Sequence, residues 1–103
     1  MKLTKSMIYK PSTEAWELYL FADNDGDLYR RMLTPIFENL AKKMRKSIYS
    51  PEEATKAYYY AMTEASSRYN REFGYSFSVT ERWTAAVDFE KENRELVAEI
   101  AGV

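Results

Sequence analysis

The apolar positions of residues 51–73 recur every three or four residues, which is the spacing of one face of an α-helix. The face consists of Ala54, Ala57, Tyr58, Ala61, Ala65, Tyr69 and Phe73. Ser50, Pro51 and Glu53 have the spacing of a helix start with a capping box. Gly74 can adopt the left-handed conformation that ends a helix. Because alanine side chains are small, this face predicts close approach by a second helix.

Residues 28–46 show a second amphipathic pattern. Its apolar positions step by four along Leu28, Met32, Ile36, Leu40 and Met44, with Tyr29, Leu33 and Phe37 beside them. The preceding residues 23–26 are typical of a turn, and Asp25 and Asp27 are both candidate caps for the helix that follows. Pro35 leaves two alternatives: the helix kinks there, or Thr34 caps a new segment with Pro35 in its first position.

The chain after Gly74 first alternates apolar and polar residues over 75–79, which predicts a short extended segment. A final helix over residues 80–100 follows, capped by Thr80 or by Ser78, which makes a second capping box with Glu81. Its apolar face is Trp83, Ala86, Val87, Leu96, Val97 and Ile100, weaker in the middle. The apolar run at 13–22 fits either a helix or a strand, and we favour the helix because the chain offers few strand partners.

These segments predict an all-α fold, a compact bundle of three to four helices. A chain of 103 residues has the size of one ordinary domain, so we expect a single domain over residues 1–103. We expect the helices at 28–46 and 80–100 to pack on the face of residues 54–73. Residues 1–11 lie outside the periodic segments and are the candidate for a loosely ordered end.

The composition argues against catalysis. The chain has nine Tyr, five Phe and two Trp, but no His and no Cys. Histidine and cysteine supply many of the general bases, nucleophiles and zinc ligands of enzymes. Three glycines are too few for a phosphate-binding loop, so we expect no enzyme and no cofactor. Asp23, Asp25 and Asp27 are out of register for a calcium loop, and we expect a turn and helix cap there with no metal.

Tyr58, Tyr59 and Tyr60 are the candidate partner-binding residues. Three consecutive positions of a helix point in three directions, so at least one of these rings should be exposed or shared with a partner. Tyrosine is enriched at interfaces because it combines a large contact area with a polar tip. The sequence therefore favours a non-catalytic accessory or modulator protein that binds a protein partner. A homodimer is a further possibility.

A basic face is the alternative binding site. On a straight helix, five basic residues lie opposite the apolar stripe: Arg30, Arg31, Lys42, Arg45 and Lys46. Such a face could hold nucleic-acid phosphates. The formal net charge of −1 weakens this alternative, because binding to nucleic acid is helped by a positive field.

No apolar run approaches the roughly 20 residues of a membrane span. The start of the chain has no apolar stretch of signal-peptide length, and the absence of cysteine fits a reducing compartment. We therefore expect no membrane association and a cytoplasmic protein.

Several short motifs carry a resemblance: residues 24–29, Pro35-Ile36, Asn39-Leu40, the lysines before Tyr49, Ala54, residues 69–73 and Arg82. In these motifs the chain resembles small helical proteins of unrecorded function that are encoded by bacteriophages, plasmids and related mobile elements. The resemblance covers residues from about 14 to 95. It implies an accessory protein in a bacterial or phage-infected cytoplasm, and it implies no functional residues.

Overall fold

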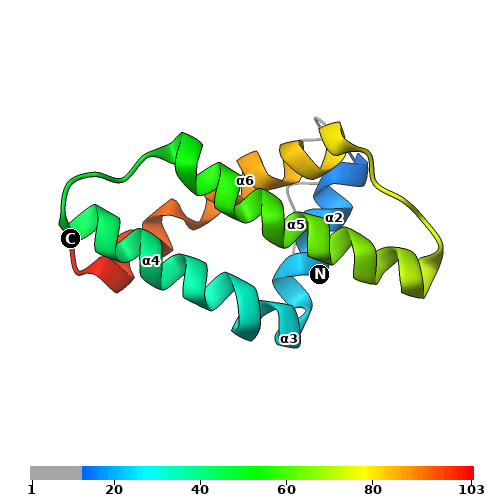
Figure 1. Cartoon of the computed structure of the whole chain (residues 1–103), viewed down its shortest axis with the longest axis horizontal. Helices are drawn as coiled ribbons and strands as arrows, with labels where there is room; N and C mark the ends of the chain where they lie inside the picture. The colour runs from blue at the N-terminus through cyan, green and yellow to red at the C-terminus, as the bar shows by residue number, and fades with distance from the viewer. Residues whose placement is uncertain (1–12) are drawn as a thin grey trace, which may run out of the picture.

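Helices joined by short turns make up the fold, which the computed structural model describes over residues 13–103 (Figure 1). The elements are α2 (Thr13–Asn24), α3 (Gly26–Leu28), the π-helical turn η1 (Tyr29–Leu33), α4 (Thr34–Arg45), α5 (Pro51–Phe73) and α6 (Val79–Ala101). No strand occurs within residues 13–103. The all-α prediction is confirmed, and residues 13–22 are helical. The expectation for residues 1–11 lies outside the described residues.

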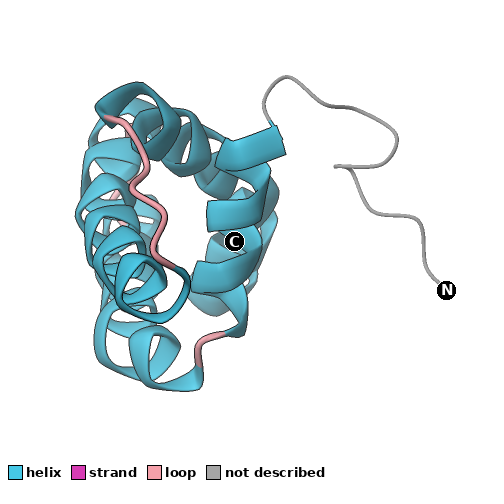
Figure 2. Ribbon diagram, turned by 90° about the vertical axis from the view of Figure 1, so that its right-hand side faces the viewer, coloured by secondary structure: helices cyan, strands magenta, loops and turns pink. Residues whose placement is uncertain are grey.

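The helix ends follow the capping residues of the sequence. The Ser50 hydroxyl accepts the Glu53 N–H at 3.3 Å, and Ser78 and Glu81 form a complete capping box. Ser78, not Thr80, is therefore the cap of α6. Gly74 ends α5 with φ of 73°, in the left-handed region that glycine tolerates best. Residues 74–78 connect α5 to α6 without forming a strand, and they run along the outside of the bundle (Figure 2).

We expect Ser50→Ala to lower the free energy of unfolding by about 1 kcal/mol, because the Glu53 N–H loses its acceptor. The measurement is equilibrium unfolding in urea. Ser67→Ala is the matched control, since Ser67 is an exposed residue inside α5, where alanine is favourable. Equal losses in both variants would contradict the capping role.

The π-helical turn η1 accommodates Pro35, which lies just after it in the first turn of α4. Pro35 has no N–H, and its ring would clash with the carbonyl four residues back in a regular α-helix. The structure instead pairs the Thr34 N–H with the carbonyl of Tyr29, five residues back. Thr34 has helical torsions, φ −59° and ψ −47°. Thr34 therefore does not cap a new segment, and that alternative is wrong.

The π-helical turn also shifts the buried face of this region. The buried side chains are Leu28, Leu33, Phe37, Leu40 and Ala41, with a step of five between the first two. The extra residue in the turn places Leu28 and Phe37 on the same side of the helix. The other members of the predicted stripe, Met32, Ile36 and Met44, are only partly buried, but they still pack against the core.

Helix α6 is the central element of the packing, because it contacts α2, α4 and α5. Figure 1 shows it running behind α4 and α5. Its buried Phe89 ring lies 5.0 Å from Tyr19 of α2, 6.2 Å from Phe37 of α4 and 5.0 Å from Tyr58 of α5, measured between ring centroids. Helix α4 packs mainly on α6 and little on α5. The predicted packing of the last helix on α5 is therefore confirmed, whereas the predicted packing of the 28–46 helix on α5 is largely wrong.

A buried carboxylate anchors the linker between α4 and α5 to α6. Glu90 is 2% exposed and accepts hydrogen bonds from Arg94 at 2.7 Å and from the Tyr49 hydroxyl at 2.8 Å. Burial raises the pKa of Glu90, but the hydrogen bonds from Arg94 and Tyr49 outweigh burial and hold that pKa below its usual value. Ser47, with φ of 60°, turns the chain after α4 and brings Tyr49 toward α6.

Candidate functional site

Exposed aromatic and apolar side chains gather where the middle of α5 meets the start of α6. Tyr60 is 70% exposed, Trp83 is 41% exposed and Val79 is 62% exposed. Tyr59 lies between the two helices, with its ring centroid 6.4 Å from Tyr60 and 5.6 Å from Trp83. Val79 and Trp83 are four positions apart on α6 and so share a face of that helix. We call these four residues the Tyr/Trp surface.

Arg82 holds Tyr59 in place within this surface. Its guanidinium carbon lies 5.8 Å from the centroid of the Tyr59 ring, and its Nη2 donates to the Tyr59 hydroxyl at 3.3 Å. Its Nη1 donates to the carbonyl of Phe77 at 2.6 Å. The same side chain therefore fixes the half-buried ring of the surface and the end of the 74–78 segment. The Tyr59 ring, held in this way, loses little conformational entropy when the surface binds.

The three consecutive tyrosines have three different environments. Tyr60 is exposed and Tyr59 is half-buried, as the prediction of at least one exposed ring requires. Tyr58 is fully buried, and burial strongly raises the pKa of its hydroxyl. Tyr58 is therefore a core residue that no partner can reach in the folded protein. Sequence reasoning placed Trp83 in the apolar face of α6 and missed its exposure.

The basic candidates Arg30, Arg31, Lys42, Arg45 and Lys46 are all exposed. Arg31 is paired with Asp27 of the same helical turn, at 2.9 Å. Lys42 and Arg45 line a hollow of about 400 Å³ together with Glu38, Ala41 and Ile100. Acidic and apolar groups therefore interrupt the basic face at both ends, which reduces its field toward phosphates.

The aspartate-rich turn at the start of α3 forms ion pairs with an arginine of the same chain. Arg68 of α5 pairs with Asp25 at 3.2 Å and with Asp27 at 2.9 Å. Asp25 also accepts the Leu28 N–H, as a helix cap does, and this hydrogen bond and Arg68 hold its pKa below the usual value. Within residues 13–103, no three acidic side chains are grouped so that they could hold a metal ion.

No known protein family, curated protein or solved structure matches the chain. The resemblance to proteins of mobile elements therefore stays an expectation. In the part of the chain that the structure describes, no helix is both long enough and apolar enough to span a membrane.

Proposed function

We propose that the protein is a non-catalytic accessory or modulator protein that binds a protein partner through the Tyr/Trp surface. The observation that carries the proposal is the exposure of Tyr60 and Trp83 on either side of Tyr59. Tyrosine and tryptophan are the residues most enriched at interface hot spots, together with arginine. Arg82, in contact with Tyr59, adds the third type.

The size of the surface bears on how it would bind. A buried tyrosine or tryptophan contributes about 150–250 Å² of contact area. A stable interface needs about 800 Å² from each partner. The Tyr/Trp surface therefore supplies the centre of an interface, and the polar residues around it would supply the rim. The alternative is that a second copy of the chain binds this surface, which would make a homodimer.

The chain's acidic groups support a non-catalytic role. The buried carboxylate of Glu90 is held by Arg94 and Tyr49, and Asp25 and Asp27 are held by Arg68. The contacts of these three carboxylates are ones that stabilise the fold, which supports a structural role for them. The resemblance to proteins of mobile elements supports a role in a bacterial or phage-infected cytoplasm.

We expect Tyr60→Ala to weaken partner binding by about 1 to 4 kcal/mol, because truncating an interface anchor has that effect. The measurement is recovery of the partner by the tagged chain from nuclease-treated lysate of the native host. Ile48→Ala is the matched control, because Ile48 is also an exposed apolar residue, 58% exposed, but lies in the linker before α5. Equal recovery by the Tyr60→Ala variant and the unaltered chain would contradict the proposal.

The salt dependence of binding separates this proposal from nucleic-acid binding by the basic face. A protein held by aromatic contacts should remain bound as salt rises moderately, whereas binding to phosphates falls steeply because counterions are released. Lys42→Glu with Lys46→Glu should leave partner recovery unchanged. Tight, salt-sensitive binding of random-sequence DNA that this double substitution abolishes would favour the alternative.

A further inference from the structure

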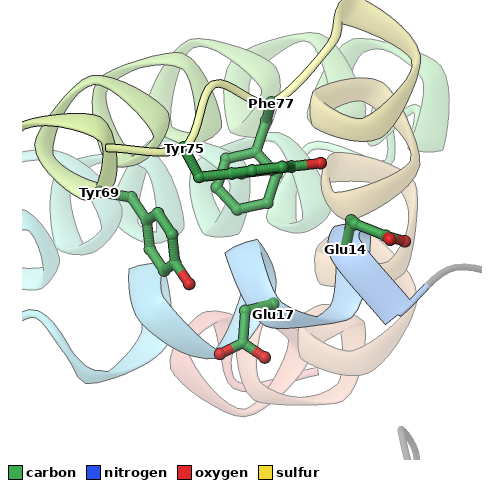
Figure 3. Close-up of a pocket in the computed structure, with 5 residues that line it drawn as sticks. All are labelled: Glu14, Glu17, Tyr69, Tyr75 and Phe77. Carbon is green, nitrogen blue, oxygen red and sulfur yellow. The ribbon is translucent and has the colours of Figure 1, made fainter. Parts of the chain in front are cut away.

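A second surface feature lies between α2 and the 74–78 segment. It is a pocket of about 180 Å³ lined by five residues: Glu14, Glu17, Tyr69, Tyr75 and Phe77. Figure 3 shows Glu14 and Glu17 on α2 and the three rings on the other side of the pocket, with the carboxyl group of Glu17 turned away from the rings in this view. We call this feature the α2 pocket. It shares no residue with the Tyr/Trp surface.

The three rings form a corner. The plane of Tyr69 makes an angle of 82° with Tyr75 and 68° with Phe77. Tyr75 and Phe77 make an angle of 80°, with their centroids 4.7 Å apart. The three rings are therefore steeply inclined to one another, and together they form the aromatic side of the pocket.

The corner is held in place by contacts on both sides of the segment. Asn70 donates to the Ser76 hydroxyl at 2.9 Å, and Arg82 donates to the Phe77 carbonyl at 2.6 Å. The Tyr75 hydroxyl donates to Glu81 at 3.2 Å, and the Phe77 side chain is only 4% exposed. The walls are therefore formed before any ligand arrives, which lowers the entropy cost of binding.

The carboxylates give the pocket a negative charge. Glu14 and Glu17 are three positions apart on α2, both are exposed, and residues at this spacing lie on one face of a helix. None of the ion pairs among residues 13–103 involves either of them. Burial, Glu81 and Glu14 raise the pKa of Tyr75, consistent with Glu14 acting on the ring across the pocket.

We propose that the α2 pocket takes the arginine or lysine side chain of a partner protein. Aromatic faces attract cations, and a guanidinium or ammonium group can at the same time donate to carboxylates. The pocket is smaller than the roughly 300–1,000 Å³ of sites for drug-sized ligands and cofactors, and it fits the end of one side chain. Two carboxylates are too few oxygen ligands for calcium, which takes six to eight. This inference stands independently of the Tyr/Trp surface.

The test is a titration of the full-length, ¹⁵N-labelled chain with N-acetyl-arginine methylamide, followed by amide chemical shifts. We expect saturable shifts confined to residues around Glu14, Glu17 and the 74–78 segment, with a dissociation constant of about 1 mM for so small a ligand. The neutral isostere N-acetyl-citrulline methylamide is the ligand control, and it should cause no saturable shift. Equal shifts with both ligands would overturn the proposal.

A second experiment tests the proposal by removing the negative charge of the α2 pocket. Glu14→Gln with Glu17→Gln should weaken binding of the arginine ligand by about tenfold or more, since charge-assisted hydrogen bonds are lost. The matched control is Glu95→Gln with Glu99→Gln, two exposed carboxylates of α6, which should leave the affinity unchanged. Binding that is unaffected by the α2 substitutions, or equally weakened by the α6 substitutions, would show non-specific attraction and end the proposal.

Discussion

Phe89→Ala should lower the free energy of unfolding by about 3–5 kcal/mol, the cost of removing a large side chain from a packed core. The ring is fully buried and contacts aromatic rings of α2, α4 and α5. Its removal therefore leaves a cavity at the point where all four long helices meet. Domains of this size are stable by about 5–15 kcal/mol, so the variant would lose a large part of its stability.

Urea unfolding of Phe89→Ala and Phe89→Leu measures this loss, and the leucine variant keeps the comparison possible if the alanine variant does not fold. Phe73→Ala is the matched control, because Phe73 is another phenylalanine but is 59% exposed at the end of α5. We expect a loss at position 73 well below that at position 89. A loss at position 89 no larger than at position 73 would contradict the central place of α6.

Arg94→Ala should lower the free energy of unfolding by about 2–4 kcal/mol at pH 7. The substitution leaves the Glu90 carboxylate buried with only the Tyr49 hydroxyl as a partner, and an unpaired buried charge is strongly destabilising. The expected loss is smaller than that for breaking a fully buried ion pair, because the Arg94 side chain is 48% exposed and solvent screens part of the interaction.

The pH dependence of this loss of stability tests whether Glu90 is the carboxylate responsible for it. In the unaltered protein the pKa of Glu90 is lowered by folding, so its stabilising contribution is present above the unfolded pKa of about 4.3 and is lost as pH falls through the folded value. Without Arg94, burial should raise that pKa, and Glu90 then takes up a proton as pH falls. The difference between the two proteins should therefore be largest near pH 7 and narrow toward about pH 4–5.

The double variant Glu90→Gln with Arg94→Ala supplies the control for this pH effect. It has no carboxylate at position 90, so its difference from Glu90→Gln alone should not vary with pH. A difference between Arg94→Ala and the unaltered protein that is constant from pH 4 to 7 would contradict the role given to Glu90 (roughly the range in which carboxyl groups titrate).

Local signals in the sequence predict most of the helix ends. Ser50, Ser78 and Gly74 act through hydrogen bonds and torsions within a few residues, so their effect does not depend on the rest of the fold. The buried face of α4 could not be predicted in the same way. Pro35 indicated a disturbance, but the shift of register depends on the π-helical turn through which the chain absorbs it.

The sequence did not indicate the central position of α6, because Glu90 stands beside Phe89. A charged residue in the middle of an apolar face weakens the pattern, and its partner Tyr49 lies 41 positions away. The sequence likewise predicted that the tyrosines at 58–60 could not share one environment, but which of them is exposed depends on where α6 packs. The α2 pocket joins residues of α2 to the 74–78 segment, and no local pattern connects them.

Site-specific photo-crosslinking from position 60 tests the central claim most directly, that the Tyr/Trp surface binds a protein. A benzoylphenylalanine in place of Tyr60 keeps an aromatic ring at that position, and the same probe in place of the exposed Lys91 of α6 is the control. Irradiation in the native host should produce an adduct with another protein from position 60, resistant to nuclease, and little or none from position 91. An adduct with nucleic acid or with a second copy of the chain, or no adduct from position 60, would contradict the account.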